Sequence, residues 1–281
     1  MPTQLPRDRY VKVGNVNTRY WQAGDKGSVV VLVHGLGGFI ENWECNIDAL
    51  AQRHRVYALD LLGFGRTDKL PLVKDVYVLV KFLADFLVTQ NIDRASFIGN
   101  SLGGGLVLMF ALHYPQKVEK LVLVDNAGMG RSVIADFKLC SLPFVGELLV
   151  RPTPHGTSRL WRKVVYDSSL VTPELVDLSF RLAAQPGARE ALLSTMRAGV
   201  NLFGQRGKYT RLLLGGLGKI TASTLIVWGN ADRVIPVAHA RIAASKIPEA
   251  KLHIWEQCGH MPMFEHPGKF NKLVLDFLAG R

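Results

Sequence analysis

The stretch Ala95-Ser96-Phe97-Ile98-Gly99-Asn100-Ser101-Leu102-Gly103-Gly104 decides the fold of this chain. Its first four residues are typical of a buried strand, and a helical pattern runs from Leu102 to Tyr114, just before Pro115. Between strand and helix lies the pattern G-x-S-x-G, which holds its serine in a strained turn and exposes the hydroxyl at a helix N-terminus. The alternative is a glycine-rich packing turn with an incidental serine. Because the strand and the helix flank the motif as it requires, we interpret Ser101 as a candidate nucleophile.

Apolar runs like the one before Gly99 recur along the chain and are typical of strands buried on both faces of a parallel sheet. The others span residues 29–33, 56–59, 121–124, 225–228 and 252–255. Helical patterns lie between or after them, at 76–90 with Asp75 as an N-cap and at the C-terminus around 270–278. Residues 9–23 predict a short strand pair that turns at Gly14-Asn15. Alternating strands and helices predict an open, mostly parallel α/β sheet.

Length and composition exclude several classes of protein. With 281 residues, of which 48% are hydrophobic, the chain can fold without disulfides or metal, and it contains no apolar run long enough to cross a membrane. Its three cysteines are far apart and suggest neither a disulfide framework nor a zinc site. The N-terminus lacks the apolar core of a signal peptide, so we expect a cytoplasmic protein. We also expect that the protein uses neither a cofactor nor a metal.

Residues 128–219 interrupt the strand–helix rhythm. This segment shows helical patterns broken by prolines and is too long for a loop, so it predicts an inserted helical subdomain between core segments 1–127 and 220–281. It also holds 13 Lys and Arg against 6 Asp and Glu, while the whole chain has a net charge of +11. Scattered basic residues favour a soluble protein with a basic surface over a nucleic-acid binder.

A serine nucleophile needs a base that is oriented by an acid. The chain order Ser, Asp, His that is typical of this motif is met by Ser101, Asp232 and His260. Asp232 follows one late strand and His260 follows the next, so both are expected at the same sheet edge as Ser101. Asp125, which also ends a strand, is the alternative acid.

The tetrahedral intermediate needs two backbone N–H donors. We expect one from Leu102 and the other from Leu36, with Gly37 as the alternative, in the loop after the first buried strand. Gly35-Leu36-Gly37-Gly38 lacks the spacing of a dinucleotide or phosphate loop. His34 is expected to hold this loop structurally.

These residues together resemble the α/β-hydrolase superfamily. The resemblance rests on His34-Gly35-Leu36-Gly37, Asp60-Leu61-Leu62-Gly63-Phe64-Gly65, the elbow around Ser101 and Gly259-His260-Met261-Pro262. It implies an eight-stranded, mostly parallel sheet flanked by helices, and an inserted helical cap at 128–219 that forms the substrate pocket. Ser101 argues against the dehalogenases and epoxide hydrolases of this superfamily, which use an aspartate nucleophile.

Within the superfamily the chain looks most like carboxylesterases and like the meta-cleavage-product hydrolases, which cut a carbon–carbon bond in aromatic degradation. Asn100 and Gln257-Cys258-Gly259-His260 look like the latter. Those enzymes, however, usually carry a Trp where this chain has Met261, and a cap arginine near the position of Ser179, with Arg181 and Arg189 as substitutes here. We therefore expect a carboxylesterase acting through an acyl-enzyme, with carbon–carbon hydrolysis or lactone hydrolysis as alternatives and a hydrolase-fold receptor as a weaker one.

Several further expectations concern ligands and partners. Asn100, Met261, Trp161 and Phe180 are candidate substrate contacts, since ligand pockets are largely apolar. The expected partner is a small-molecule ester, without nucleic acid or membrane, and a homodimer is left open. The basic charge of the inserted segment predicts a positive field near the pocket mouth that favours anionic substrates.

Overall fold

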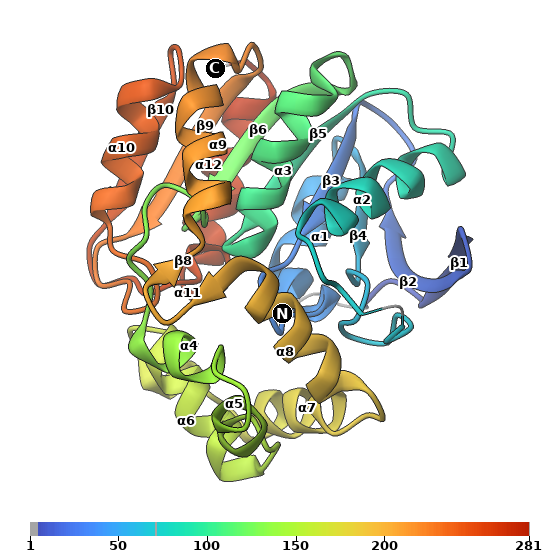
Figure 1. The fold of residues 1–281 in the computed structure, drawn as a ribbon. Coiled ribbons are helices and arrows are strands. Elements are labelled where there is room, and N and C mark those ends of the chain that lie inside the picture. Colours follow the sequence, from blue (N-terminus) through green and yellow to red (C-terminus); the bar gives the residue numbers. More distant parts are fainter. Residues whose placement is uncertain (1–4, 71, 281) are drawn as a thin grey trace.

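An eight-stranded sheet runs through the centre of the computed structural model, which describes residues 5–70 and 72–280 (Figure 1). The strand order is β1-β2-β4-β3-β5-β6-β9-β10. Strand β2 pairs antiparallel with β1 and with β4, and all other neighbouring strands pair parallel. The strands are β1 (Arg9–Val13), β2 (Val16–Ala23), β3 (Val29–Val33), β4 (Arg55–Leu59), β5 (Ala95–Asn100), β6 (Val118–Val124), β9 (Ser223–Gly229) and β10 (Lys251–Trp255). Each predicted strand is present, and the predicted α/β class is confirmed.

Helices cover both faces of the sheet, and the alternation of side chains along each strand feeds both cores. In β3, Val29, Val31 and Val33 join the core under α2 and α3, whereas Val30 and Leu32 join the core under α1 and α12. This two-sided burial explains the uninterrupted apolar run. The helices around the sheet are α1 (Glu44–Ala51), α2 (Tyr77–Thr89), α3 (Leu102–His113), α10 (Ala238–Lys246), α11 (Pro262–Glu265) and α12 (Pro267–Leu278), and two short 3-10 helices are η1 (Ile40–Trp43) and η2 (Pro115–Lys117).

The start of α2 differs slightly from the sequence prediction. Asp75 was expected to be the N-cap, but the N-cap position falls on Val76. The carboxylate of Asp75 still accepts a hydrogen bond from the Tyr77 N–H at 3.0 Å. It therefore satisfies a free N–H of the first turn from one residue further out.

Between β6 and β9 the chain is mainly helical, and α4 to α8 lie together below the sheet in the view of Figure 1. Pro154 and Pro173, which break the sequence pattern, are the first residues of α6 and α7. The short hairpin β7–β8 was not predicted, because two-residue strands carry no periodicity. The elements are α4 (Ala135–Cys140), α5 (Val145–Leu149), α6 (Pro154–Val164), η3 (Ser168–Leu170), α7 (Pro173–Ala183), α8 (Ala188–Gly199), β7 (Val200–Asn201), β8 (Gly204–Gln205), α9 (Gly207–Gly216) and η4 (Leu217–Lys219). The division into core and cap at 128 and 219 stays a prediction.

Within the described part of the chain, no helix combines the length and the apolar character needed to span a bilayer.

Candidate active site

Ser101 lies in a sharp turn between β5 and α3. Its backbone angles are φ 55° and ψ −117°, a region that residues other than glycine rarely adopt. Glycine neighbours make the turn feasible, because a Cβ on Gly99 would lie 2.6 Å from the Gly103 carbonyl carbon and one on Gly103 would lie 2.2 Å from the Val33 oxygen. The sequence motif therefore forms the strained elbow that was predicted.

The predicted base and acid are in contact. His260 Nδ1 lies 2.7 Å from Asp232 Oδ2, and both side chains are almost fully buried. Asp232 Oδ1 accepts hydrogen bonds from the N–H groups of Val234 and Ile235, at 2.7 and 3.0 Å, which fix the carboxylate. No hydrogen bond joins Ser101 Oγ to His260 among the residues that the structure describes. Such contacts are often long without substrate and tighten when it binds.

Two backbone contacts hold the loop that carries His260. Asn100 Nδ2 donates to the His260 carbonyl at 3.1 Å and to the Val124 carbonyl at 3.3 Å. The His260 N–H donates to the carbonyl of Val164, at the end of α6, at 2.8 Å. The residue before the candidate nucleophile and the inserted segment thus both position the candidate base.

The glycine loop after β3 approaches the elbow closely, as an oxyanion loop should. A Cβ on Gly35 would lie 3.0 Å from Ser101 Cβ, and both Leu36 and Leu102 line the cleft next to Ser101. His34 is fully buried; its Nδ1–H donates to the Gly35 carbonyl and its Nε2 accepts from the Leu61 N–H at 3.0 Å. Burial lowers the pKa of His34 to about 4, so the ring is neutral at pH 7. The structural role expected for His34 is confirmed.

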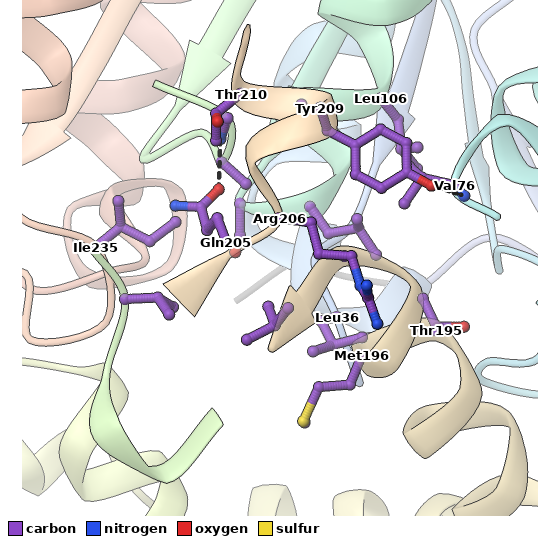
Figure 2. Close-up of a pocket in the computed structure, with 18 of the residues that line it drawn as sticks. Leu36, Val76, Leu106, Thr195, Met196, Gln205, Arg206, Tyr209, Thr210 and Ile235 are labelled. Carbon is purple, nitrogen blue, oxygen red and sulfur yellow. Dashed lines mark hydrogen bonds between the residues drawn. The ribbon is translucent and has the colours of Figure 1, made fainter. Parts of the chain in front are cut away.

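Ser101 opens onto a cleft between the sheet edge and α8 and α9, with about 670 Å³ of empty space including its mouth (Figure 2). Most lining side chains are apolar, among them Leu36, Leu106, Met109, Val133, Phe137, Met196, Leu213 and Ile235.

Most polar groups of the cleft already form hydrogen bonds within the protein. Gln205 binds the Gly128 N–H and the Ser132 carbonyl, and Tyr209 Oη accepts from the Val76 N–H. Arg206 is the one cation of this lining; its Nε donates to the Arg197 carbonyl at 2.8 Å. Figure 2 shows its side chain between Tyr209 and Met196.

The candidate substrate contacts Asn100, Met261, Trp161 and Phe180 are not among the residues that line this cleft, and their role in binding substrate stays a prediction. Asn100 uses its amide as described above, and Met261 is packed in the core beside α12. Trp161 is buried and donates from Nε1 to Ser179 Oγ at 2.9 Å, while Phe180 is half-buried on α7. Arg181 is exposed and pairs with Asp177, and Arg189 is half-buried and pairs with Glu190.

A buried ionic cluster supports the loops around the site and was missed by sequence reasoning. Arg19 is 1% exposed and contacts carboxylates of Asp8, Glu41 and Asp60 at 2.6, 2.8 and 3.3 Å. Asp60 in turn accepts from the N–H groups of Ile40 and Arg66, at 2.8 Å each. It thereby ties the segment after the glycine loop to the Asp60–Gly65 stretch. Arg19 lies in an antiparallel strand with an ordinary pattern, so nothing in the sequence marks it.

Comparisons with known proteins agree with this geometry. Over 289 aligned residues the chain is 31% identical to a 2-hydroxy-6-oxononadienedioate/2-hydroxy-6-oxononatrienedioate hydrolase of Paraburkholderia xenovorans strain LB400, covering 99% of this chain and 97% of that protein. It superposes on the meta-cleavage product hydrolase of Pseudomonas fluorescens IP01 with a TM-score of 0.83 and 28% identity over 98% of each chain. A membrane phospholipase A matches with a TM-score of 0.77 and 27% identity, over 98% of this chain and 86% of the other. The sequence profile of the α/β hydrolase fold matches residues 28–267, and the chain therefore belongs to this family.

Proposed function

We propose that the protein is a serine hydrolase that cleaves the carbon–carbon bond next to a ketone in meta-cleavage products of the 2-hydroxy-6-oxo-dienoate kind. The observation that carries the proposal is that the strained Ser101 opens onto an apolar cleft, while Asn100, the residue before it, binds the backbone of His260, whose ring is hydrogen-bonded to Asp232. The named activity of the Paraburkholderia relative supports this choice of substrate over a simple ester.

In this proposal Ser101 Oγ bonds to the ketone carbon while His260 takes the hydroxyl proton. The N–H groups of Leu36 and Leu102 hold the oxyanion, and loss of one such donor costs about 3 kcal/mol of transition-state stabilisation. The bond to the neighbouring carbon then breaks. This step uses the 2,6-diketo tautomer of the substrate, in which the proton of the 2-hydroxyl has moved to the carbon next to the ketone. The electron pair of the broken bond is then delocalised into a dienolate, whose oxygen takes the proton from His260. Water, activated by His260, hydrolyses the acyl-enzyme that remains.

Carboxylic ester hydrolysis, the activity expected from the sequence, is the second candidate. A specific observation favours it: Ser179, which the resemblance places near the position where those carbon–carbon hydrolases usually carry an arginine, is buried and bound to Trp161. The substitutes Arg181 and Arg189 lie on the surface in local ion pairs. An ester needs no cation at this position.

Steady-state kinetics on the purified protein decide between the two. We expect 2-hydroxy-6-oxononadienedioate or its 6-phenyl analogue to be turned over with a kcat/KM well above that of p-nitrophenyl butyrate and of a simple lactone. The opposite order would establish the ester or lactone activity. In either case Ser101→Ala should abolish turnover and labelling by a fluorophosphonate. Undiminished turnover in this variant would reject the triad altogether.

A further inference from the structure

A second carboxyl group lies beside the acid of the candidate triad. Asp125 follows β6, is fully buried, and adopts a left-handed backbone conformation with φ 45°. Its Oδ1 accepts a hydrogen bond from the Gly229 N–H at 3.1 Å, whereas among the described residues no donor reaches its buried Oδ2. An unsatisfied buried carboxylate oxygen is costly, so this atom calls for an explanation.

The neighbour of Asp125 is Asp232. An oxygen of each carboxyl group lies within 4.8 Å of the other and of a ring nitrogen of His260. Asp232 cannot supply the missing proton, because its oxygens accept from His260, Val234 and Ile235. If both carboxylates were ionised, each would offer only hydrogen-bond acceptors to the other, and the two negative charges would repel. One proton placed between them turns this repulsion into a hydrogen bond.

The other titratable groups around the pair do not remove the need for that proton. Glu265 of α11 adds a further negative charge near Asp125. His239 of α10 is buried, and burial lowers its pKa; burial of the Cys258 thiol raises its pKa, so the thiol is neutral. Burial, and next the charge of Asp232, raise the pKa of Asp125 well above its usual value of 3.8.

We propose that Asp125 and Asp232 share one proton, which is carried by Asp125 and donated in a hydrogen bond to the Asp232 carboxylate. The pair then presents a single negative charge to His260. Asp125 acts as a positioning residue, since it holds the carboxylate that orients the imidazole and does not itself touch substrate. The shared proton is independent of the proposed function, whereas the effect on turnover rests on it.

The proton is tested without any substrate. Asp125→Asn keeps the shape, the acceptor for the Gly229 N–H and a donor towards Asp232, but cannot ionise. A protonated Asp125 stabilises the fold fully below about pH 4, and this stability is lost as rising pH ionises the unfolded chain. The melting temperature of the wild type relative to Asp125→Asn should therefore fall by several degrees between about pH 4 and pH 7. The infrared difference spectrum at about pH 7 should show a protonated-carboxyl band in the wild type alone. A constant melting difference and no such band would overturn the proposal.

The positioning role is tested by kinetics, with whichever substrate the protein turns over. Asp125→Asn should keep kcat within about threefold and leave the acid limb of the kcat/KM profile in place, because the charge near His260 is unchanged. Asp125→Ala removes the donor and should lower kcat on the order of tenfold with little change in KM. If Asp125→Asn moves the acid limb down by about one pH unit, the native Asp125 is charged and the proposal is wrong. Full kcat in a folded Asp125→Ala would exclude the positioning role. If that variant does not fold, the acid limb of the Asp125→Asn profile still tests whether the native Asp125 is protonated.

Discussion

The side-chain amide of Asn100 donates a hydrogen bond to the backbone carbonyl of His260, 3.1 Å away. The residue directly before the candidate nucleophile therefore holds the loop of the candidate base, and the substrate contact expected of Asn100 from sequence stays a prediction. The same amide binds the end of β6 through the Val124 carbonyl. One buried side chain thus ties the ends of β5 and β6 to the loop that follows β10.

This contact predicts the effect of Asn100→Ala. Without the amide, the backbone of His260 loses one of its two hydrogen bonds, and we expect kcat to fall about tenfold while KM changes little. Asn46→Ala is the control, because it removes a buried amide that binds the Met263 carbonyl and not His260. Equal losses of kcat in the two variants would mean that Asn100 acts only through general stability.

His34 predicts a pH dependence of stability. Burial lowers its pKa to about 4 in the folded protein, below the 6.5 of a free histidine. Its contribution is present above pH 6.5 and is lost as the pH falls towards 4, because the unfolded chain takes up the proton first. The free energy of urea unfolding of the wild type, relative to His34→Gln, should shrink by about 3 kcal/mol between pH 7 and pH 4.5. A difference that does not vary with pH would show that the folded protein accommodates a charged His34.

The strand-based part of the site could be predicted from sequence, whereas its side-chain networks could not. Ser101, Asp232 and His260 were found because parallel strands place their carboxyl ends at one edge, which makes position along the chain informative. Part of the cleft lining comes from α8 and α9, where periodicity gives a face but not the element that this face packs against. Arg19 and Asp125 sit in segments whose patterns are those of any strand or strand end. Their roles depend on which buried charges meet, and that is set by tertiary contacts between residues far apart in sequence.

The basic inserted segment predicts a preference for anionic substrates. Among its basic residues, Arg206 is the one that lines the cleft. Lys163, Arg197 and Lys208 each pair with a carboxylate, whereas Arg206 lines the cleft with its Nε on a backbone carbonyl. We expect Arg206→Gln to lower kcat/KM about fivefold at low salt for a substrate with a distal carboxylate, such as mono-p-nitrophenyl adipate, and to leave p-nitrophenyl hexanoate unaffected.

Arg211→Gln is the matched control for charge, because Arg211 lies on α9 but outside the cleft lining. If this variant lowers the rate with the adipate ester as much as Arg206→Gln does, the effect is a general field. If neither variant changes the preference, the basic surface has no role in substrate selection.

The packing of α3 against β3 predicts that the elbow tolerates no side chain at Gly103. A Cβ there would lie 2.2 Å from the Val33 oxygen and 2.6 Å from the His34 oxygen, and both are backbone atoms that cannot rotate away. The helix must shift, which moves Leu102 and the turn at Ser101. We expect Gly103→Ala to lower the free energy of unfolding by about 3 kcal/mol and kcat/KM by about 100-fold.

Gly215→Ala, also in a helix, has open space around its Cβ and should raise stability by up to about 1 kcal/mol with unchanged kinetics. Chemical denaturation and steady-state kinetics on both variants separate the steric effect from helix propensity. Retained activity in Gly103→Ala would mean that the conformation of Ser101 does not depend on this close approach.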